Sequence, residues 1–140
     1  MRIGIVGAGG VGSVVGGLLS HGGHDVTLVD QWPEHINKIK SDGLLVESRD
    51  QTILTRPNAI HICELAQITD PFEAAFIAVK SYDTTWATAL MLDYVDPESG
   101  VFVDFQNGIN DERMAAVAGA HRSLGCVIII GVGCYEPGKA

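Results

Sequence analysis

Residues 1–12 read MRIGIVGAGGVG, a short apolar run that passes directly into a glycine-rich turn. Gly7, Gly9 and Gly12 match the pattern G-x-G-x-x-G. In this pattern the first glycine allows a tight turn, the second admits a pyrophosphate close to the backbone, and the third lets a helix pack on a strand. A second apolar run, HDVTLVD, ends at Asp30, 18 positions after Gly12. This context favours a dinucleotide-binding β-α-β unit, and the alternative is a glycine turn without a ligand.

The rest of the chain continues to alternate between helical and strand-like spacing of apolar residues. Pro33 opens a predicted helix over residues 33–42, Gly43 suits its C-terminal cap, and residues 43–55 predict a small hairpin. Further strands are predicted at residues 70–80, 100–106 and 123–138, and further helices at residues 83–95 and 110–119. We therefore predict an α/β fold of Rossmann type, with a doubly wound, mostly parallel sheet and helices on both faces. Residues 1–140 would form one dinucleotide-binding domain.

The composition restricts the classes of partner. Because 46% of the residues are hydrophobic, the chain is predicted to fold rather than to remain disordered. A net charge of -8 argues against nucleic acid and against anionic membranes as partners. The uncharged residues 3–20 include seven glycines, which disfavours a signal peptide or membrane span, so we expect a cytoplasmic protein. Three cysteines without a C-x-x-C pair predict free thiols buried in the core.

The histidines do not predict a metal site. His21 and His24 have the spacing H-x-x-H, but they fall in a turn and no acidic or cysteine ligand accompanies them. His35, His61 and His121 are isolated in the sequence. We expect each of these three to lie at the surface or to have its hydrogen bonds satisfied inside the protein.

Polar residues follow several of the predicted parallel strands. The run FIAVKSYD, residues 76–83, places Lys80 at the end of an apolar stretch, where burying an unpaired ammonium would cost several kcal/mol. Asp30 and Asn107 also follow strands, and ligands of such sheets bind beyond the carboxyl ends of the strands. We therefore expect one crevice lined by these residues. The alternatives are an ion pair of Lys80 with Asp83 and an ordinary turn at Asn107.

Five segments resemble the N-terminal domain of the ketopantoate reductases (2-dehydropantoate 2-reductases) in order and spacing. They are MRIGIVGAGGVG, GHDVTLVD, FIAVKSYDT, FQNGIND and EPG, and the resemblance runs along essentially all 140 residues. The most specific feature is AVKSYDT followed about 25 residues later by QNG. The resemblance implies that this domain binds a nicotinamide cofactor. It also implies that a C-terminal helical domain completes the cleft, in which 2-dehydropantoate is reduced to pantoate for pantothenate and coenzyme A biosynthesis.

The resemblance also assigns roles to residues. It implies that Lys80 lies beside the nicotinamide and the substrate, and that Asn107 contacts both the cofactor and the keto acid, so these two are the catalytic candidates. The backbone around Val132 would border the nicotinamide. The candidate cofactor-binding residues are Gly7, Ala8, Gly9, Gly10, Val11, Gly12, Asp30, Gln31, Lys80, Asn107 and Val132. Trp32 either stacks near the adenine or packs on the helix that Pro33 opens.

Two features differ from the family pattern. The proton-donating lysine of the family belongs to the helical domain. Residues 1–140 are therefore expected to be inactive alone and to need that domain as a partner. Whether the protein forms a homodimer is left open by the sequence. Many members carry a basic residue after the second strand, where this chain has Asp30 and Gln31. The cofactor is therefore NAD or NADP, and the aspartate favours NADH because a carboxylate can accept bonds from the ribose hydroxyls.

Two other functions remain open on the sequence. One is a non-catalytic NAD-sensing regulatory module of a potassium transport system, which has a similar glycine turn. The other is a dehydrogenase of opines or sugar acids with a related cofactor domain. The pair AVKSYDT and QNG favours the reductase, since a sensor has no evident need for it.

Overall fold

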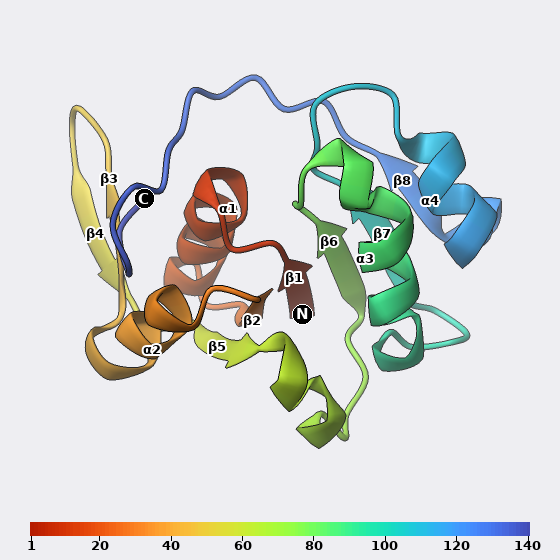
Figure 1. Ribbon diagram of the computed structural model, residues 1–140, viewed down its shortest axis with the longest axis horizontal. Helices are drawn as coiled ribbons and strands as arrows, with labels where there is room; N and C mark the ends of the chain where they lie inside the picture. The colour runs from red at the N-terminus through yellow and green to blue at the C-terminus, as the bar shows by residue number, and fades with distance from the viewer.

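A six-stranded parallel sheet organises the computed structural model, which describes residues 1–140 (Figure 1). The strands are β1 (Arg2–Val6), β2 (Asp25–Asp30), β3 (Leu44–Glu47), β4 (Thr52–Thr55), β5 (Asn58–His61), β6 (Ala74–Ile77), β7 (Val101–Asp104) and β8 (Ser123–Gly125). The α-helices are α1 (Gly10–His21), α2 (Pro33–Asp42), α3 (Thr84–Met91) and α4 (Asp111–Ala118). Short 3₁₀ helices follow at η1 (Ile62–Gln67), η2 (Ser81–Asp83), η3 (Leu92–Tyr94) and η4 (Ala120–Arg122). None of the helices has the length and apolar character needed to cross a bilayer.

The order of the strands is β5-β2-β1-β6-β7-β8, and every neighbouring pair is parallel. The chain builds outward from β1 to β5 and then returns to β6 on the other side of β1, so the direction of winding reverses between β1 and β6. This is the doubly wound arrangement predicted from the sequence. The predicted hairpin is also present, because β3 and β4 pair antiparallel as a separate sheet.

Helices cover both faces of the sheet, as predicted. On one face Ile5 of β1 and Leu28 of β2 share a buried cluster with Ile36 of α2, and α1 and the hairpin lie on the same side (Figure 1). On the other face Met91 of α3 and Met114 of α4 belong to a second buried cluster. Alternate residues of β1 point to opposite faces, which is why a central parallel strand is apolar along its whole length.

Two predicted strands are shorter than expected. β6 ends at Ile77, so Lys80 lies beyond the sheet and is exposed. The strand expected over residues 123–138 ends at Gly125, because β8 is an edge strand and its only partner, β7, pairs as far as Asp104. Without a partner, residues 126–135 form no regular structure despite their high β-propensity.

The end of the chain returns to the opposite side of the molecule. In the C-terminal segment, defined here as residues 131–140, the last three residues run parallel to β3. The Leu45 N–H donates to the Gly138 carbonyl at 2.9 Å, and the Ala140 N–H donates to the Leu45 carbonyl at 2.9 Å. Figure 1 shows the connection from β8 passing over the carboxyl ends of the sheet strands to reach the hairpin.

The strand β5 and the exposure of the cysteines differ from the predictions. β5 has only two buried apolar residues, Ala59 and Ile60, which is too short a run to predict a strand. The thiols are free, as predicted, but Cys63 is exposed and Cys126 and Cys134 are partly exposed, so the prediction of core thiols was wrong.

Candidate functional site

A cleft of about 630 Å³ lies at the carboxyl ends of the central strands, where the winding of the sheet reverses. Its volume is in the range of small-molecule sites. Among the predicted residues, the cleft is lined by Gly7, Ala8, Gly9, Gly10, Val11, Asp30, Gln31, Lys80, Asn107 and Val132. Gly12 is buried behind the turn and does not line the cleft. The structure therefore brings residues from five regions of the sequence around one cavity.

The glycine turn has two glycines with different structural roles. A Cβ atom on Gly12 would collide with the carbonyl oxygen of Gly7, so only glycine lets the first turn of α1 approach the end of β1 this closely. Around Gly9, in contrast, no heavy atom beyond its own chain neighbours lies within 4 Å of the place where a Cβ would be. Gly9 is exposed, and the space over it opens into the cleft.

The start of α1 favours an anion in the cleft. This helix has 12 residues, its N-cap is Gly9, and no side chain caps its first amides. No acidic residue lies in its first turn. Since the N-terminus of a helix carries a partial positive charge and unpaired N–H groups, this end of α1 suits a phosphate or pyrophosphate.

Asp30 is held at the rim of the cleft by the backbone on both sides. Its Oδ2 accepts from the Ala8 N–H at 2.6 Å, and its Oδ1 accepts from the Trp32 N–H at 2.9 Å. A carboxylate has about four acceptor positions. The two protein bonds therefore fix the orientation of the carboxylate and leave acceptor positions for hydroxyl groups of a ligand.

Lys80 and Asn107 extend from the ends of β6 and β7 into the cleft without strong partners of their own. None of the six ion pairs in the structure includes Lys80, so the pairing with Asp83 that was considered from the sequence is not formed. Asn107 is exposed, and only its backbone carbonyl is engaged, by the Asn110 side chain at 3.2 Å. Both side chains are free to meet a ligand.

Gln106 joins the two strand ends, a role that the sequence did not reveal. Its Nε2 donates to the Val79 carbonyl at 2.7 Å, while its Oε1 accepts from the Thr84 hydroxyl at 2.8 Å. Its own N–H donates to Asp104 at 3.0 Å, and burial raises the pKa of the Asp104 carboxyl. Gln106 is 7% exposed, and a buried amide with both ends bonded fixes the spacing of the segments it joins.

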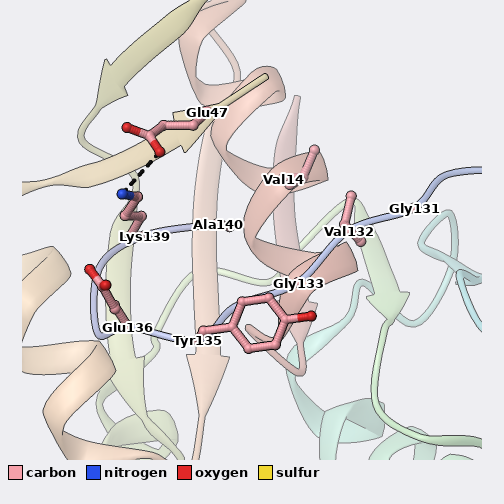
Figure 2. A pocket seen from close by; sticks show the side chains of 9 residues that line it. All are labelled: Val14, Glu47, Gly131, Val132, Gly133, Tyr135, Glu136, Lys139 and Ala140. Atoms are coloured by element: carbon pink, nitrogen blue, oxygen red, sulfur yellow. Dashed lines mark ion pairs between the residues drawn. The ribbon is translucent and has the colours of Figure 1, made fainter. Parts of the chain in front are cut away.

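A second cavity lies between α1, β3 and the C-terminal segment (Figure 2). It measures about 340 Å³, is open to solvent, and is lined by Val14 of α1, Glu47 of β3 and residues of the C-terminal segment. Its charged groups include an ion pair between Lys139 and Glu47 at 3.0 Å. Val132 and Gly133 line both cavities, so the C-terminal segment is a thin partition whose position shapes the cleft.

Trp32 lines the cleft and also packs on its own helix. Its ring stacks on the ring of His35, with the centroids 5.1 Å apart and the planes 11° apart. Of the two interpretations from the sequence, packing at the start of α2 is therefore observed. Nowhere in the structure are three His, Cys, Asp or Glu side chains grouped so as to hold a metal ion.

Comparison with known proteins agrees with this geometry. The family described as "Ketopantoate reductase PanE/ApbA" matches residues 3–140. The chain belongs to the ketopantoate reductase family.

Among curated relatives in this family, the 2-dehydropantoate 2-reductase of Halobacterium salinarum is 33% identical over 135 residues, which cover 92% of this chain and 40% of that protein. The enzyme of the same name from Pyrococcus horikoshii is 32% identical and is matched over 99% of this chain and 43% of its own length. A crystal structure of 2-dehydropantoate 2-reductase from Geobacter metallireducens superposes with a TM-score of 0.85 at 26% identity, over 99% of this chain and 45% of that one. The chain thus spans about two fifths of the length of its ketopantoate reductase relatives.

Proposed function

We propose that residues 1–140 bind a nicotinamide dinucleotide in the 630 Å³ cleft and form the cofactor-binding part of an oxidoreductase that reduces a 2-keto acid, 2-dehydropantoate. The observation that carries this proposal is the convergence of the glycine turn, Asp30, Lys80 and Asn107 on one cavity at the reversal point of the sheet. The names of the relatives support the choice of substrate. The family match also covers the segments that a potassium-transport regulator would not need, and it therefore disfavours that alternative.

In this proposal the cofactor extends across the carboxyl edge of the sheet. The pyrophosphate lies over Gly9 at the start of α1, and the adenosine ribose donates hydrogen bonds to Asp30. The nicotinamide lies on the other side of the turn, between Val132 and Lys80. When bound, the reduced cofactor supplies the hydride.

Lys80 and Asn107 act on the substrate in this proposal. Hydride addition to a keto group develops negative charge on the carbonyl oxygen, next to a carboxylate that is already negative. A free ammonium at the end of β6 stabilises both charges. Asn107 offers an amide N–H to the same oxygen or to the cofactor, which would orient the reacting groups. The helical domain implied by the family resemblance would cover this side of the cleft.

The first test is dinucleotide binding by the 140-residue chain itself. The phosphate-binding turn is formed within residues 1–140, so NADH is expected to bind with a Kd in the range of roughly 0.1 to 1 mM, as for a ligand held on one side only. Isothermal titration calorimetry measures this affinity, and circular dichroism verifies the fold. A folded protein that gives no binding heat with millimolar NADH or NADPH would contradict the proposal.

The second test is the choice between NADH and NADPH. NADH is expected to bind roughly 10- to 100-fold more tightly, because the 2′-phosphate of NADPH would lie against Asp30. The two lysines of α2 are not available to neutralise the 2′-phosphate, because Lys38 pairs with Asp42 at 2.6 Å and Lys40 pairs with Glu64 at 2.7 Å. Apart from Lys80, no basic residue lines the cleft. Competitive titration of the two cofactors measures the ratio.

Two variants test whether the position of the Asp30 carboxylate, rather than the net charge of the chain, determines the preference for NADH. The double change Asp30→Ala, Gln31→Arg is expected to reverse the preference. Asp93→Ala removes one exposed carboxylate that does not line the cleft, and it should keep the preference for NADH. Equal or tighter binding of NADPH by the wild-type chain would show that Asp30 does not face the ribose.

A further inference from the structure

His35 is fully buried on α2 and connects parts of the chain that are far apart in the sequence. Its Nε2 lies 3.2 Å from the Ser13 Oγ, at the start of α1. Its Nδ1 accepts a hydrogen bond from the Gly138 N–H at 2.9 Å. The ring therefore joins the glycine-turn helix to the C-terminal segment. Gly138 is 103 residues away from His35 in the sequence.

The hydrogen bonds around His35 define its tautomer. The Ser13 hydroxyl has one hydrogen, and it donates this hydrogen to the Ala8 carbonyl at 2.7 Å. The Ser13 oxygen must then accept, so Nε2 of His35 carries the proton. Gly138 can only donate through its N–H, so Nδ1 carries no proton. Both partners require the same neutral ring.

The connection continues into the glycine turn. Ser13 holds the carbonyl of Ala8, and the N–H of Ala8 donates to Asp30 at 2.6 Å. The Ala8 residue is thus held on both sides, between the buried serine and the carboxylate expected to bind the ribose. One path of hydrogen bonds joins Gly138 to the turn over which the pyrophosphate is proposed to lie.

We infer that His35 is a positioning residue for dinucleotide binding: through Ser13 it holds the glycine turn in shape, and through Gly138 it makes that shape depend on the docked C-terminal segment. The inference rests on the proposed cofactor binding. Val132 and Gly133 of the same segment line both cavities, so its docking also determines how closely these two residues approach the cofactor. Bound dinucleotide in turn favours the docked segment, since the coupling is reciprocal.

Protonation of His35 would break this connection at one defined atom. A proton on Nδ1 replaces the acceptor of the Gly138 N–H with a second donor, whereas the bond from Nε2 to Ser13 persists. Burial lowers the pKa of His35, and the negative charge of Asp30 partly offsets this shift. The docked segment is therefore fully stabilised above the ordinary histidine pKa of 6.5 and is released as the pH falls from there through the lowered pKa.

The other titratable and charged groups around His35 come from three elements. Asp30 faces it from β2, and the Cys134 thiol lies 3.7 Å from Nδ1 on the C-terminal segment. Burial raises the pKa of this thiol, so it stays protonated and neutral in the relevant pH range. Lys38 lies one turn further along α2, where its ammonium pairs with Asp42. The Gly138 N–H bonds to His35 itself, so protonation of His35 disrupts this contact directly.

The test measures the affinity of the 140-residue chain for NAD⁺, which is stable in acid, between about pH 8 and about pH 5.5. Wild-type affinity is expected to fall about 3- to 10-fold over this range, the effect of losing one buried hydrogen bond. Simple attraction between imidazolium and the pyrophosphate would give the opposite sign. By linkage, saturating NAD⁺ should lower the pKa of His35 in a nuclear magnetic resonance titration.

Two substitutions separate the two bonds of the ring. In His35→Gln the longer amide reaches the Nε2 position and keeps the bond to Ser13, but it loses the acceptor for Gly138. In His35→Asn the shorter amide keeps the acceptor for Gly138 and loses the donor to Ser13. Each variant is expected to bind NAD⁺ about 3- to 10-fold more weakly at pH 8 and to lose the dependence on pH. His24→Gln, at an exposed turn, should behave as the wild type.

The outcomes distinguish this inference from the proposed function. If the folded wild-type chain does not bind NAD⁺, both the proposed function and the role of His35 are contradicted. If the wild type binds NAD⁺ and both His35 variants bind it with the same affinity and pH profile, only the role of His35 is contradicted. If the variants do not fold, ¹⁵N-labelled wild type decides: long-range ¹H–¹⁵N spectra should show a protonated Nε2 and an unprotonated Nδ1, and the other tautomer would overturn the inference.

Discussion

Replacing Gly12 by alanine is expected to destabilise the domain by about 3 kcal/mol or more, which corresponds to a fall in Tm on the order of 10 °C. The added Cβ would overlap the carbonyl oxygen of Gly7, a backbone atom that cannot move without displacing α1 from β1. The usual gain of about 1 kcal/mol from alanine in a helix is too small to offset this collision. Thermal unfolding followed by circular dichroism measures the effect.

Gly9→Ala is the matched control in the same turn. The place of its Cβ is empty, so stability is expected to change by less than about 0.5 kcal/mol. The same atom would occupy the space proposed for the pyrophosphate, and NADH affinity is expected to fall at least about 10-fold. The proposed division of roles would be wrong if Gly12→Ala kept the wild-type Tm. It would also be wrong if Gly9→Ala bound NADH as well as the wild type.

Lys80→Ala is expected to lower kcat/KM for a 2-keto acid by roughly 100-fold or more in a protein that joins this domain to the remaining part of a ketopantoate reductase. Lys80 lines the cleft and forms no ion pair, so its charge is available to the developing oxyanion. A steady-state assay with 2-dehydropantoate and NADH measures the change. The longer protein is used because residues 1–140 alone are expected to be inactive.

The control for this substitution is Lys40→Ala. Lys40 pairs with Glu64 and lies outside the cleft, so this change removes an equal charge without touching the site, and kcat/KM should remain within about twofold. Wild-type kcat/KM in Lys80→Ala would show that the residue has no catalytic role. An equal loss in both variants would show that net charge, rather than the position of Lys80, matters.

The features that the sequence predicted correctly depend on neighbouring residues. The glycine turn, the helix after Pro33 and the hairpin of β3 and β4 each follow from a few consecutive residues, because turn chemistry, capping and apolar period act locally. Asp30 and Lys80 were predicted to lie at one edge of the sheet, because the carboxyl ends of parallel strands lie at the same edge. In the structure both residues line the cleft.

The incorrect predictions concern segments whose structure depends on distant partners. Residues 126–135 have strand-forming side chains, but β7 is too short to pair with them. β5 has a weak apolar pattern, but β2 offers an open edge with which it pairs. In both cases the neighbouring strand, rather than the local propensity, determined the result.

By itself the sequence determined that this chain folds as a doubly wound sheet with a glycine turn, because the apolar spacing and the glycines act over a few residues. Only the tertiary structure decided how that turn is held. His35, isolated in the sequence, meets Ser13 from one direction and Gly138 from another. Gln106 meets Val79 and Thr84 in the same way. Such polar contacts form where folding buries donors and acceptors that must find partners, and the sequence spacing does not reveal which partners these will be.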